Sequence, residues 1–568
     1  MNSHFLLTNN NASDIASTYT GNSFVLSGFN SNKSNIFIKG YVLPRFDDKI
    51  NYIDKQGHDL VVHLIEKFPD SWMDKVKGRF VILVMNQNEF TVVTDHLGLY
   101  PIYLKDTDNG FTLSDSFWAL NPEKSDFNEK ALKSKALFHR EVGTITIAKS
   151  IQKIEGGSIV SYKNGKLTIK KYWKPSHLLK PLNKKLKIPF FTNLIKQQVK
   201  QVSDLFKPTD YSITLTGGKD SRTALAAMLN QGIKPIGFTY GNQNSKDAAY
   251  AKMLASKANI EHQIFTPPSE ESWINEMYSN LLDQEHPWIN VHRAHRLFAF
   301  QKVSKQLTLN TAYFAGYLGG ELLMGIYYDD LIFSSFLTRT WENQVLKPEK
   351  ILEHHFIKST KKDDLKFDLE TLNKDKSSFY KQFQGLFEIG VPHHAQDLTL
   401  SGNFFDYPIA FFLDIDFLSY LFQSKYSFEF ADNKTKNPFQ RYKLFKFNLN
   451  IQHTLASELD DVPFAKKGTY STKEFKRGAI YWSFVKIIRY FTDRKKFPSS
   501  YSYNDKYRGF VLGELQKIKR DDKHPIHSYY DLDKAIKHLE SHEDLRQEKH
   551  WHRFTNIIMT YNQLNKFV

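Results

Sequence analysis

Residues 211–228 read YSITLTGGKDSRTALAAM, and this stretch decides the fold of the chain. Residues 211–215 alternate β-forming and hydroxyl residues, as a short buried strand does. The sequence from Arg222 onward has the alanine, leucine and methionine content of a helix. The six residues TGGKDS lie between them. The stretch therefore predicts a strand, a loop and a helix in direct succession.

The TGGKDS loop has the residue types that hold phosphate. Gly217 and Gly218 free the backbone from the limits that a Cβ sets and let it approach a ligand closely. The start of the next helix offers free N–H groups and a positive dipole end. Thr216 and Ser221 add hydroxyl donors, and the carboxylate of Asp220 could hold Mg²⁺ against phosphates. The loop matches neither GxxxxGK[ST] nor GxGxxG.

The loop resembles the Ser-Gly-Gly-x-Asp-Ser loop of the PP-loop, or N-type, ATP pyrophosphatases, with Thr216 where serine is usual. Those enzymes cleave ATP to AMP and pyrophosphate, so the resemblance implies ATP and Mg²⁺ as cofactors. It also implies that the loop and the end of its strand, from Leu215 to Ser221, surround the phosphates. Because six residues with two glycines also fit a plain strand-to-helix turn, the surrounding sequence must decide.

Composition limits the class of protein. The 568 residues suffice for three to four domains, or two large ones. The 77 basic and 61 acidic residues give +16, which favours an anionic partner or a lysine-rich solvated surface. The absence of cysteine excludes disulfides, thiolate metal sites and a cysteine nucleophile. Without a secretory pattern or a long apolar run, we expect a soluble cytoplasmic protein with no membrane partner.

Residues 1–175 predict a strand-rich domain with one helix at 58–68. The β-type runs are 23–26, 36–38, 80–85, 90–94, 102–104, 143–147 and 158–162. Their order resembles the class II glutamine amidotransferase domain of asparagine synthetases. TDHLGLYPIY at 94–103 stands where that family has its Arg-Asp-x-x-Gly-x-x-Pro-Leu-Tyr turn. The resemblance implies an Ntn-type αββα sandwich, and an unrelated β-sandwich is the alternative.

The nucleophile of the active amidotransferases is missing. In them a cysteine, exposed at the N-terminus after Met removal, attacks glutamine. This chain has Asn2 there and no cysteine, and an amide side chain cannot serve as that nucleophile. We therefore predict no glutaminase activity. The domain would be a structural relic or a docking surface, as in β-lactam synthetase, which this loss resembles.

Residues 176–568 predict a synthetase domain. Residues 236–240 read as a second strand, followed by a helix and a third strand, so we expect a doubly wound parallel sheet with ligand at the carboxyl ends of its strands. The resemblance adds a PP-loop or HUP-like topology and adenine beside Phe238. The basic and aromatic residues 475–568 predict a helical C-terminal extension that covers the site. Asp247 and His262 occupy family positions, although a helix cap and a core histidine explain them equally well.

A second signature follows at residues 313–325, YFAGYLGGELLMG. It resembles Ser-Gly-Glu-Gly-Ser-Asp-Glu-Leu-Phe-Gly-Gly of asparagine synthetases, which implies that Gly316 borders the nucleotide. Gly320 stands where the family has its second Mg²⁺-binding Asp, so Asp220 would remain from the usual pair. Either Glu321 shifts into the role, or phosphates mainly hold one metal, or catalysis is impaired. A glycine-rich turn with a buried tyrosine is the alternative.

Tyr317 replaces the first glutamate of this signature, as in β-lactam synthetase, where a Tyr–Glu pair deprotonates the attacking amine. A phenol with an ordinary pKa near 10 can do so only if its proton is taken up or its pKa is lowered. Glu349 and Glu353 are the nearest candidates for its partner. Downstream, Asp414 is expected to cap a buried helix.

Lys466 and Lys467, in LDDVPFAKKGTYS, stand where the family carries a lysine that neutralises charge on the acyl-adenylate and pyrophosphate. A cation there would stabilise the transition state electrostatically. An exposed basic pair is the competing interpretation.

These resemblances imply an ATP-dependent, AMP-forming carbon–nitrogen ligase. A carboxylate would be adenylated and joined to an amine that the substrate itself brings, including intramolecular cyclisation as in β-lactam synthetase or lasso peptide cyclase. The implied partners are a small-molecule or peptide substrate and a protein that delivers it; nucleic acid is not expected. The alternatives are an impaired nucleotide-binding scaffold, suggested by Gly320, and a PP-loop RNA-modifying enzyme, which the charge of +16 would suit.

Overall fold

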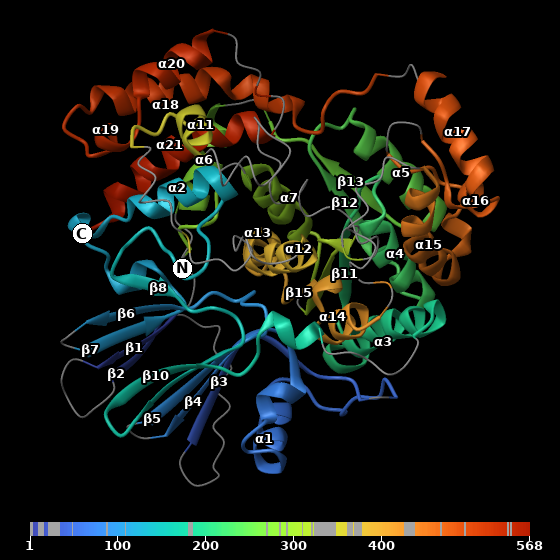
Figure 1. The fold of residues 1–568 in the computed structure, drawn as a ribbon, viewed down its shortest axis with the longest axis horizontal. Helices are drawn as coiled ribbons and strands as arrows, with labels where there is room; N and C mark the ends of the chain where they lie inside the picture. The colour runs from blue at the N-terminus through green and yellow to red at the C-terminus, as the bar shows by residue number, and fades with distance from the viewer. Residues whose placement is uncertain are drawn as a thin grey trace.

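The computed structural model describes most of the chain (Figure 1). The residues outside the description are 1–3, 10–15, 21–33, 48, 87–88, 108–109, 180–185, 269–270, 283–285, 291–292, 309, 320–321, 323–347, 360–366, 368–377, 425, 427–437, 466–468, 493–495, 542–544 and 546–547. The predicted strand at 23–26 falls among them, as do Gly320, Glu321, Lys466 and Lys467.

Two antiparallel sheets form the N-terminal part. In the described residues the first has the order β2 (Ala16–Thr20), β1 (His4–Asn9), β7 (Gly110–Ser114), β6 (Tyr103–Thr107), β8 (Ile151–Lys153). The second has the order β10 (Lys166–Lys171), β9 (Ser158–Lys163), β5 (Glu89–Thr94), β4 (Val76–Asn86), β3 (Ser34–Pro44). Alternate apolar residues of both sheets, such as Leu7 and Leu83, form the core between them.

One helix covers the outer face of each sheet, which confirms the αββα sandwich. α1 (Gly57–Lys67), close to the predicted helix, packs its buried leucines against the second sheet. α2 (Glu129–Phe138) shares a core with Tyr103 and Ile151 of the first. The predicted strand at 143–147 is wrong. Gly143 is left-handed (φ +60°), and the hydroxyl of Thr146 donates to local carbonyls, so a turn forms there instead.

A parallel sheet occupies the middle of the chain, as predicted. Its order in the described residues is β13 (His262–Phe265), β12 (Ile236–Tyr240), β11 (Asp210–Thr214), β14 (Thr311–Ala315), β15 (Tyr407–Ala410). One face carries α3 (Ile188–Phe206), α4 (Asp220–Asn230), α5 (Lys246–Ala258) and α15 (Pro438–Leu455). The other carries α7 (Ala294–Ser304) and α13 (Val391–Ser401). The chain proceeds outward from β11 to β13 and returns to β14, so the strand order reverses beside β11.

The C-terminal helices divide between two places (Figure 1). α18 (Arg508–Arg520), α20 (Leu532–Glu540) and α21 (Glu548–Lys566) cluster near α2, and the N–H of Val568 donates to the carbonyl of Pro122 at 3.0 Å. α17 (Ala479–Thr492) lies on the other side of the molecule, beside α15, with much of its apolar face exposed. The expectation that residues 475–568 cover the synthetase site therefore holds only for a short segment around Ser500. Every helix in the described residues is too short or too polar to cross a lipid bilayer.

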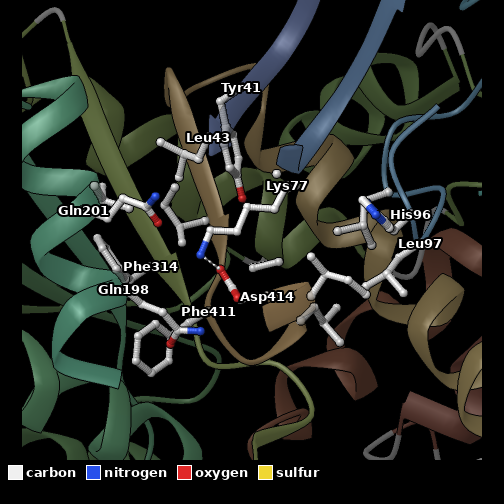
Figure 2. Close-up of a pocket in the computed structure, with 17 residues that line it drawn as sticks. Tyr41, Leu43, Lys77, His96, Leu97, Gln198, Gln201, Phe314, Phe411 and Asp414 are labelled. Atoms are coloured by element: carbon white, nitrogen blue, oxygen red, sulfur yellow. Dashed lines mark ion pairs between the residues drawn. The ribbon is translucent and has the colours of Figure 1, made fainter. Parts of the chain in front are cut away.

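A buried ion-pair network joins the N-terminal sandwich to the parallel-sheet region, and Figure 2 shows one pair of it, between Lys77 and Asp414. The ammonium of Lys77, whose residue is 1% exposed, lies 2.8 Å from Asp414 and 3.0 Å from Asp416. Arg45 donates to the other oxygen of Asp416 at 2.7 Å. Asp414 also accepts from the N–H groups of Asp416 and Phe417 and begins α14 (Ile415–Phe422), which confirms the predicted cap. Beside the pair is a cavity of about 30 Å³.

Asp416→Asn is expected to lower the free energy of unfolding at pH 7 by about 3 kcal/mol, because it leaves Lys77 buried without its full counter-charge. Burial alone would raise the pKa of Asp416, but Lys77 and Arg45 lower it to about 2. Since an aspartate in an unfolded chain titrates near pH ~4, the contribution is complete above that pH and is lost as the pH falls toward 2.

Urea unfolding at pH 7 and near pH 3 measures both effects. Wild type should lose more stability on acidification than Asp416→Asn does. Asp461→Asn is the control, because Asp461 pairs with Lys473 at an exposed site. Equal acid sensitivity in wild type and Asp416→Asn would contradict the role given to this carboxylate.

Candidate functional site at the start of α4

The TGGKDS loop lies at the carboxyl end of β11, where the strand order reverses. Its hydroxyls organise the turn. The backbone N–H of Thr216 donates to Oγ of Ser221 at 3.2 Å, and the N–H of Gly218 donates to Oγ1 of Thr216 at 3.1 Å. α4 begins at Asp220, and the residue before it, Lys219, supplies no capping side chain. The first turn of α4 thus resembles a helix end built to receive an anion.

The two loop glycines have different neighbours. Neither has a positive φ, so the predicted backbone freedom is not the reason for them. A Cβ on Gly217 would lie 2.1 Å from Cβ of Ala465 and 2.8 Å from Cβ of Tyr250, whereas one on Gly218 would meet only Oγ1 of Thr216, at 3.0 Å. Gly217 is required by protein packing, and Gly218 faces the open side of the loop.

Asp247 joins the site from α5. Its carboxylate accepts from the backbone N–H of Gly217 and, at 3.2 Å, from the hydroxyl of Ser500, and burial raises its pKa. The cap of α5 is Ser245, so interpreting Asp247 as a helix cap is wrong. His262 forms a 2.9 Å hydrogen bond with Thr239. Burial lowers the pKa of His262 to about 4, so it is a neutral, half-buried part of the sheet.

Two predicted nucleotide contacts lie within the sheet. The N–H of Leu215 donates to the carbonyl of Phe238 at 2.7 Å, and the carbonyl of Leu215 accepts from Thr239 at 2.8 Å. The ring of Phe238 is fully buried and packs near Phe300 and Tyr313. Both residues therefore shape the floor of the site, and the side chain of Phe238 is not available to stack on adenine.

Lys219 and Arg222 bind a distant segment to the loop. The ammonium of Lys219 lies 4.2 Å from the ring centroid of Phe445, 5.1 Å from Phe464 and 5.5 Å from Tyr470. We call these three rings the aromatic cage. Arg222 donates to the carbonyls of residues 462 and 463 at 2.5 and 2.9 Å. The lysine of TGGKDS thus points into protein and not toward phosphate.

The same segment carries Lys466 and Lys467, which lie outside the described residues. Its flanks are described. The N–H of Ala465 donates to the carbonyl of Gly217 at 2.8 Å, and Tyr470 belongs to the aromatic cage around Lys219. The chain before and after the two lysines is therefore held against the loop.

The second signature reaches the loop from β14. A Cβ on Gly316 would lie 3.0 Å from the backbone nitrogen of Ser221, so these two backbones are in close contact. The hydroxyl of Tyr317 lies 3.3 Å from that of Tyr313, which is 2.6 Å from Oγ1 of Thr214. Burial raises the pKa of Tyr317 well above its ordinary value. The phenol is protonated at neutral pH and suits hydrogen-bond donation, not proton abstraction.

The ring of Tyr317 stacks on His394 of α13, at 5.3 Å between centroids. One turn further along α13, the buried carboxylate of Asp397 pairs with Arg293 and Arg296. The expected glutamate partners are elsewhere. Glu349 and Glu353 belong to α11 (Pro348–His354), which packs against α2, and Glu353 pairs with Lys534 at 3.0 Å. Nothing in the sequence indicated that His394 would take this place.

Few protein side chains are placed to bind a metal ion at this site. Asp220 is half-buried at the mouth of the loop, and Glu321 lies outside the described residues. In the part of the chain that the structure describes, no three histidine or acidic side chains gather as a metal cluster. This donor set fits Mg²⁺ held by one carboxylate and nucleotide phosphates, a common arrangement for that ion.

Two family models match the chain. The glutamine amidotransferase domain matches residues 49–173, and the queuosine biosynthesis protein QueC matches residues 212–294, which contain the TGGKDS loop. No curated protein sequence matches.

Solved structures match only distantly. NMN synthetase from Francisella tularensis is 16% identical over 25% of this chain and 59% of its own, with a TM-score of 0.20. Glutamine phosphoribosylpyrophosphate amidotransferase from B. subtilis is 9% identical over 56% and 75%, with a TM-score of 0.18. An allosteric regulatory enzyme of purine biosynthesis is 10% identical over 42% and 61%, with a TM-score of 0.17.

The two family models match in the order amidotransferase, then PP-loop, and each lies on the corresponding part of the fold. These matches fit an asparagine synthetase-like two-domain architecture.

Proposed function

We propose that the protein is an ATP-dependent, AMP-forming carbon–nitrogen ligase, with a domain boundary near residue 175. The uncapped start of α4 at the switch point carries the proposal, because an anion there would complete a helix end that the protein leaves open. Thr216, Gly218 and Ser221 would hold phosphate, and Asp220 would hold Mg²⁺, which shields phosphate charge and orients the α-phosphorus for attack by a carboxylate.

The closing segment supports the same chemistry. Because Ala465 and Tyr470 contact the loop on both sides of Lys466 and Lys467, we propose that these lysines neutralise charge on the adenylate and pyrophosphate. Positive charge at that place would bind the transition state more strongly than the ground state, and would thereby raise the rate.

The amine is proposed to come with the substrate. The chain has no cysteine to release ammonia from glutamine. A small molecule or peptide that carries both a carboxylate and an amine would undergo intramolecular amide formation. The reaction would take place in the cytoplasm, and a partner protein could deliver the substrate. Tyr317 would donate a hydrogen bond that positions the reacting group, because its pKa is raised and not lowered.

ATP–pyrophosphate exchange with Mg²⁺, tested against pools of small and peptide carboxylates, examines the proposal. We expect exchange with one pool, reduced about ten- to a hundredfold in Asp220→Ala, since phosphates supply the other metal ligands. Asp210→Ala is the control at the opposite end of β11. Tight ATP binding without exchange in any pool would favour a nucleotide-binding scaffold.

Tyr317→Phe is expected to separate the two half-reactions. Pyrophosphate exchange should stay within about twofold of wild type, whereas amide formation should fall about tenfold or more, as for loss of one positioning hydrogen bond. The pH–rate profile of wild type should show no ionisation from Tyr317 at or below its ordinary pKa near 10. A basic group titrating near neutral pH that disappears in Tyr317→Phe would show that the phenol is the base. Tyr481→Phe, at a tyrosine paired with Arg477, is the control.

A further inference from the structure

A second cavity, of about 510 Å³, separates the N-terminal sandwich from the helices that precede β15. Its N-terminal wall includes His96, Arg140 and Lys153. The opposite wall comes from α12 (Ser378–Gly385), the π-helical turn η8 (Leu386–Gly390) and the start of α13. The volume is in the range of small-molecule sites, and no residue of the TGGKDS loop lines it.

Within the described part of the chain, two cations at this cavity form no direct ion pair, although the Glu141 carboxylate lies near enough to act on both electrostatically. Arg140 is 2% exposed, and although its Nε donates to the carbonyl of Glu141, its buried Nη1 has no acceptor. In the described residues, no carboxylate pairs with Arg140 or Lys153. Both lie by the indole of Trp288, at 5.9 and 5.4 Å from the ring.

The neighbouring carboxylates are already engaged. Glu141 pairs with Lys135 at 2.8 Å, and Glu155 pairs with Lys171 at 3.2 Å. Arg140 and Lys153 therefore repel each other in a partly desolvated space, an arrangement that costs stability unless an anion enters. A carboxylate or phosphate group would offer acceptors to both.

We propose that this cavity binds a small carboxylate- or phosphate-bearing anion at a site separate from the TGGKDS loop. Polar Gln384 and apolar Phe387 on the opposite wall suit a ligand with an anionic end and a less polar body. The site is also connected to the candidate synthetase site. Pro392 lines the cavity, and His394, two residues further along α13, stacks on Tyr317.

The proton on Lys153 makes binding depend on pH. Burial, and then Arg140, lower the pKa of Lys153 to about 7, against the opposing effects of Glu141, Glu155 and Asp95. Two other lining groups have shifted pKa values: burial lowers the pKa of His96 to about 3, and burial also lowers the pKa of Lys171, which pairs with Glu155. Glu388 faces the cavity from η8. An anion should bind more tightly below pH 7, where Lys153 is protonated, and more weakly above it.

Titration calorimetry with citrate and, separately, inorganic phosphate tests the site, because these probes represent the two anion chemistries. We expect saturable binding of at least one probe at pH 6, about tenfold weaker at pH 8.5. Lys153→Met should weaken binding at pH 6 by about tenfold and remove most of the pH dependence. Lys149→Met, at an exposed lysine just before β8, should change neither.

Ser221→Ala distinguishes this site from the TGGKDS loop. Binding of the probe at the cavity should be unchanged in Ser221→Ala. This binding requires neither ATP nor turnover, so its test is independent of the test of the ligase proposal. Binding lost in Ser221→Ala but kept in Lys153→Met would assign the probe to the loop and overturn the inference. Absence of saturable binding by both probes at millimolar concentration would overturn it too.

Discussion

Asp397→Asn is expected to lower the free energy of unfolding by about 3–5 kcal/mol, because it leaves two buried guanidinium groups without a counter-charge. Asp397 and Arg293 are fully buried, and Arg296 nearly so. Burial alone would raise the pKa of Asp397, but the two arginines hold it well below its ordinary value. The Asp397 carboxylate thus joins α13 to α7 and to Arg293, the residue just before α7. Arg293 also donates a hydrogen bond to Gln396 at 2.9 Å.

Chemical unfolding at pH 7 measures this effect. Glu353→Gln is the matched control, since it removes a carboxylate from an exposed pair with Lys534, and such pairs contribute about 0–1 kcal/mol. If the two variants lost the same small amount, Asp397 would not be the link between the helices. Because α13 also presents His394 to Tyr317, a folded Asp397→Asn protein should form amide more slowly than wild type.

The parallel sheet was predictable from the sequence because its signals are local. The strand at 211–215, the TGGKDS loop and the strand at 236–240 each appear as a short run with its own turn residues, and the structure has them at nearly those bounds. Asp414 was predictable as a cap for the same reason. The prediction of a strand at 143–147 was wrong because the β-branched residues there favour a strand, whereas Gly143 and the Thr146 hydroxyl favour a turn.

The environment of the site was not predictable, since it depends on contacts far apart in sequence. The lysine of TGGKDS enters an aromatic cage more than two hundred residues away. His394 faces Tyr317, where a glutamate was expected from the resemblance. Lys77 meets Asp414 across the interface between the two parts of the molecule (Figure 2). No periodicity or spacing encodes such pairs, and only packing of the whole chain brings them together.

Gly217→Ala is expected to displace the segment that closes the loop. The new methyl carbon would lie 2.1 Å from Cβ of Ala465, so residues 462–465, or the loop itself, must move. We expect a loss of about 1–3 kcal/mol of stability from this overpacking. Pyrophosphate exchange should fall at least about a hundredfold, because the loop and the segment that contacts it would shift, and misplacement by about 1 Å near a reacting group has effects of that size.

Gly218→Ala is the matched control for this prediction, one residue along the same loop. Its methyl carbon would meet only the end of the Thr216 side chain, at 3.0 Å, so unfolding should be close to that of wild type. Exchange should still fall, because the methyl group would stand on the side of the loop that is open to a ligand. Thermal unfolding and exchange, measured on both variants, separate the two roles. Greater destabilisation by Gly218→Ala than by Gly217→Ala would mean that the closing segment does not depend on contact with the loop.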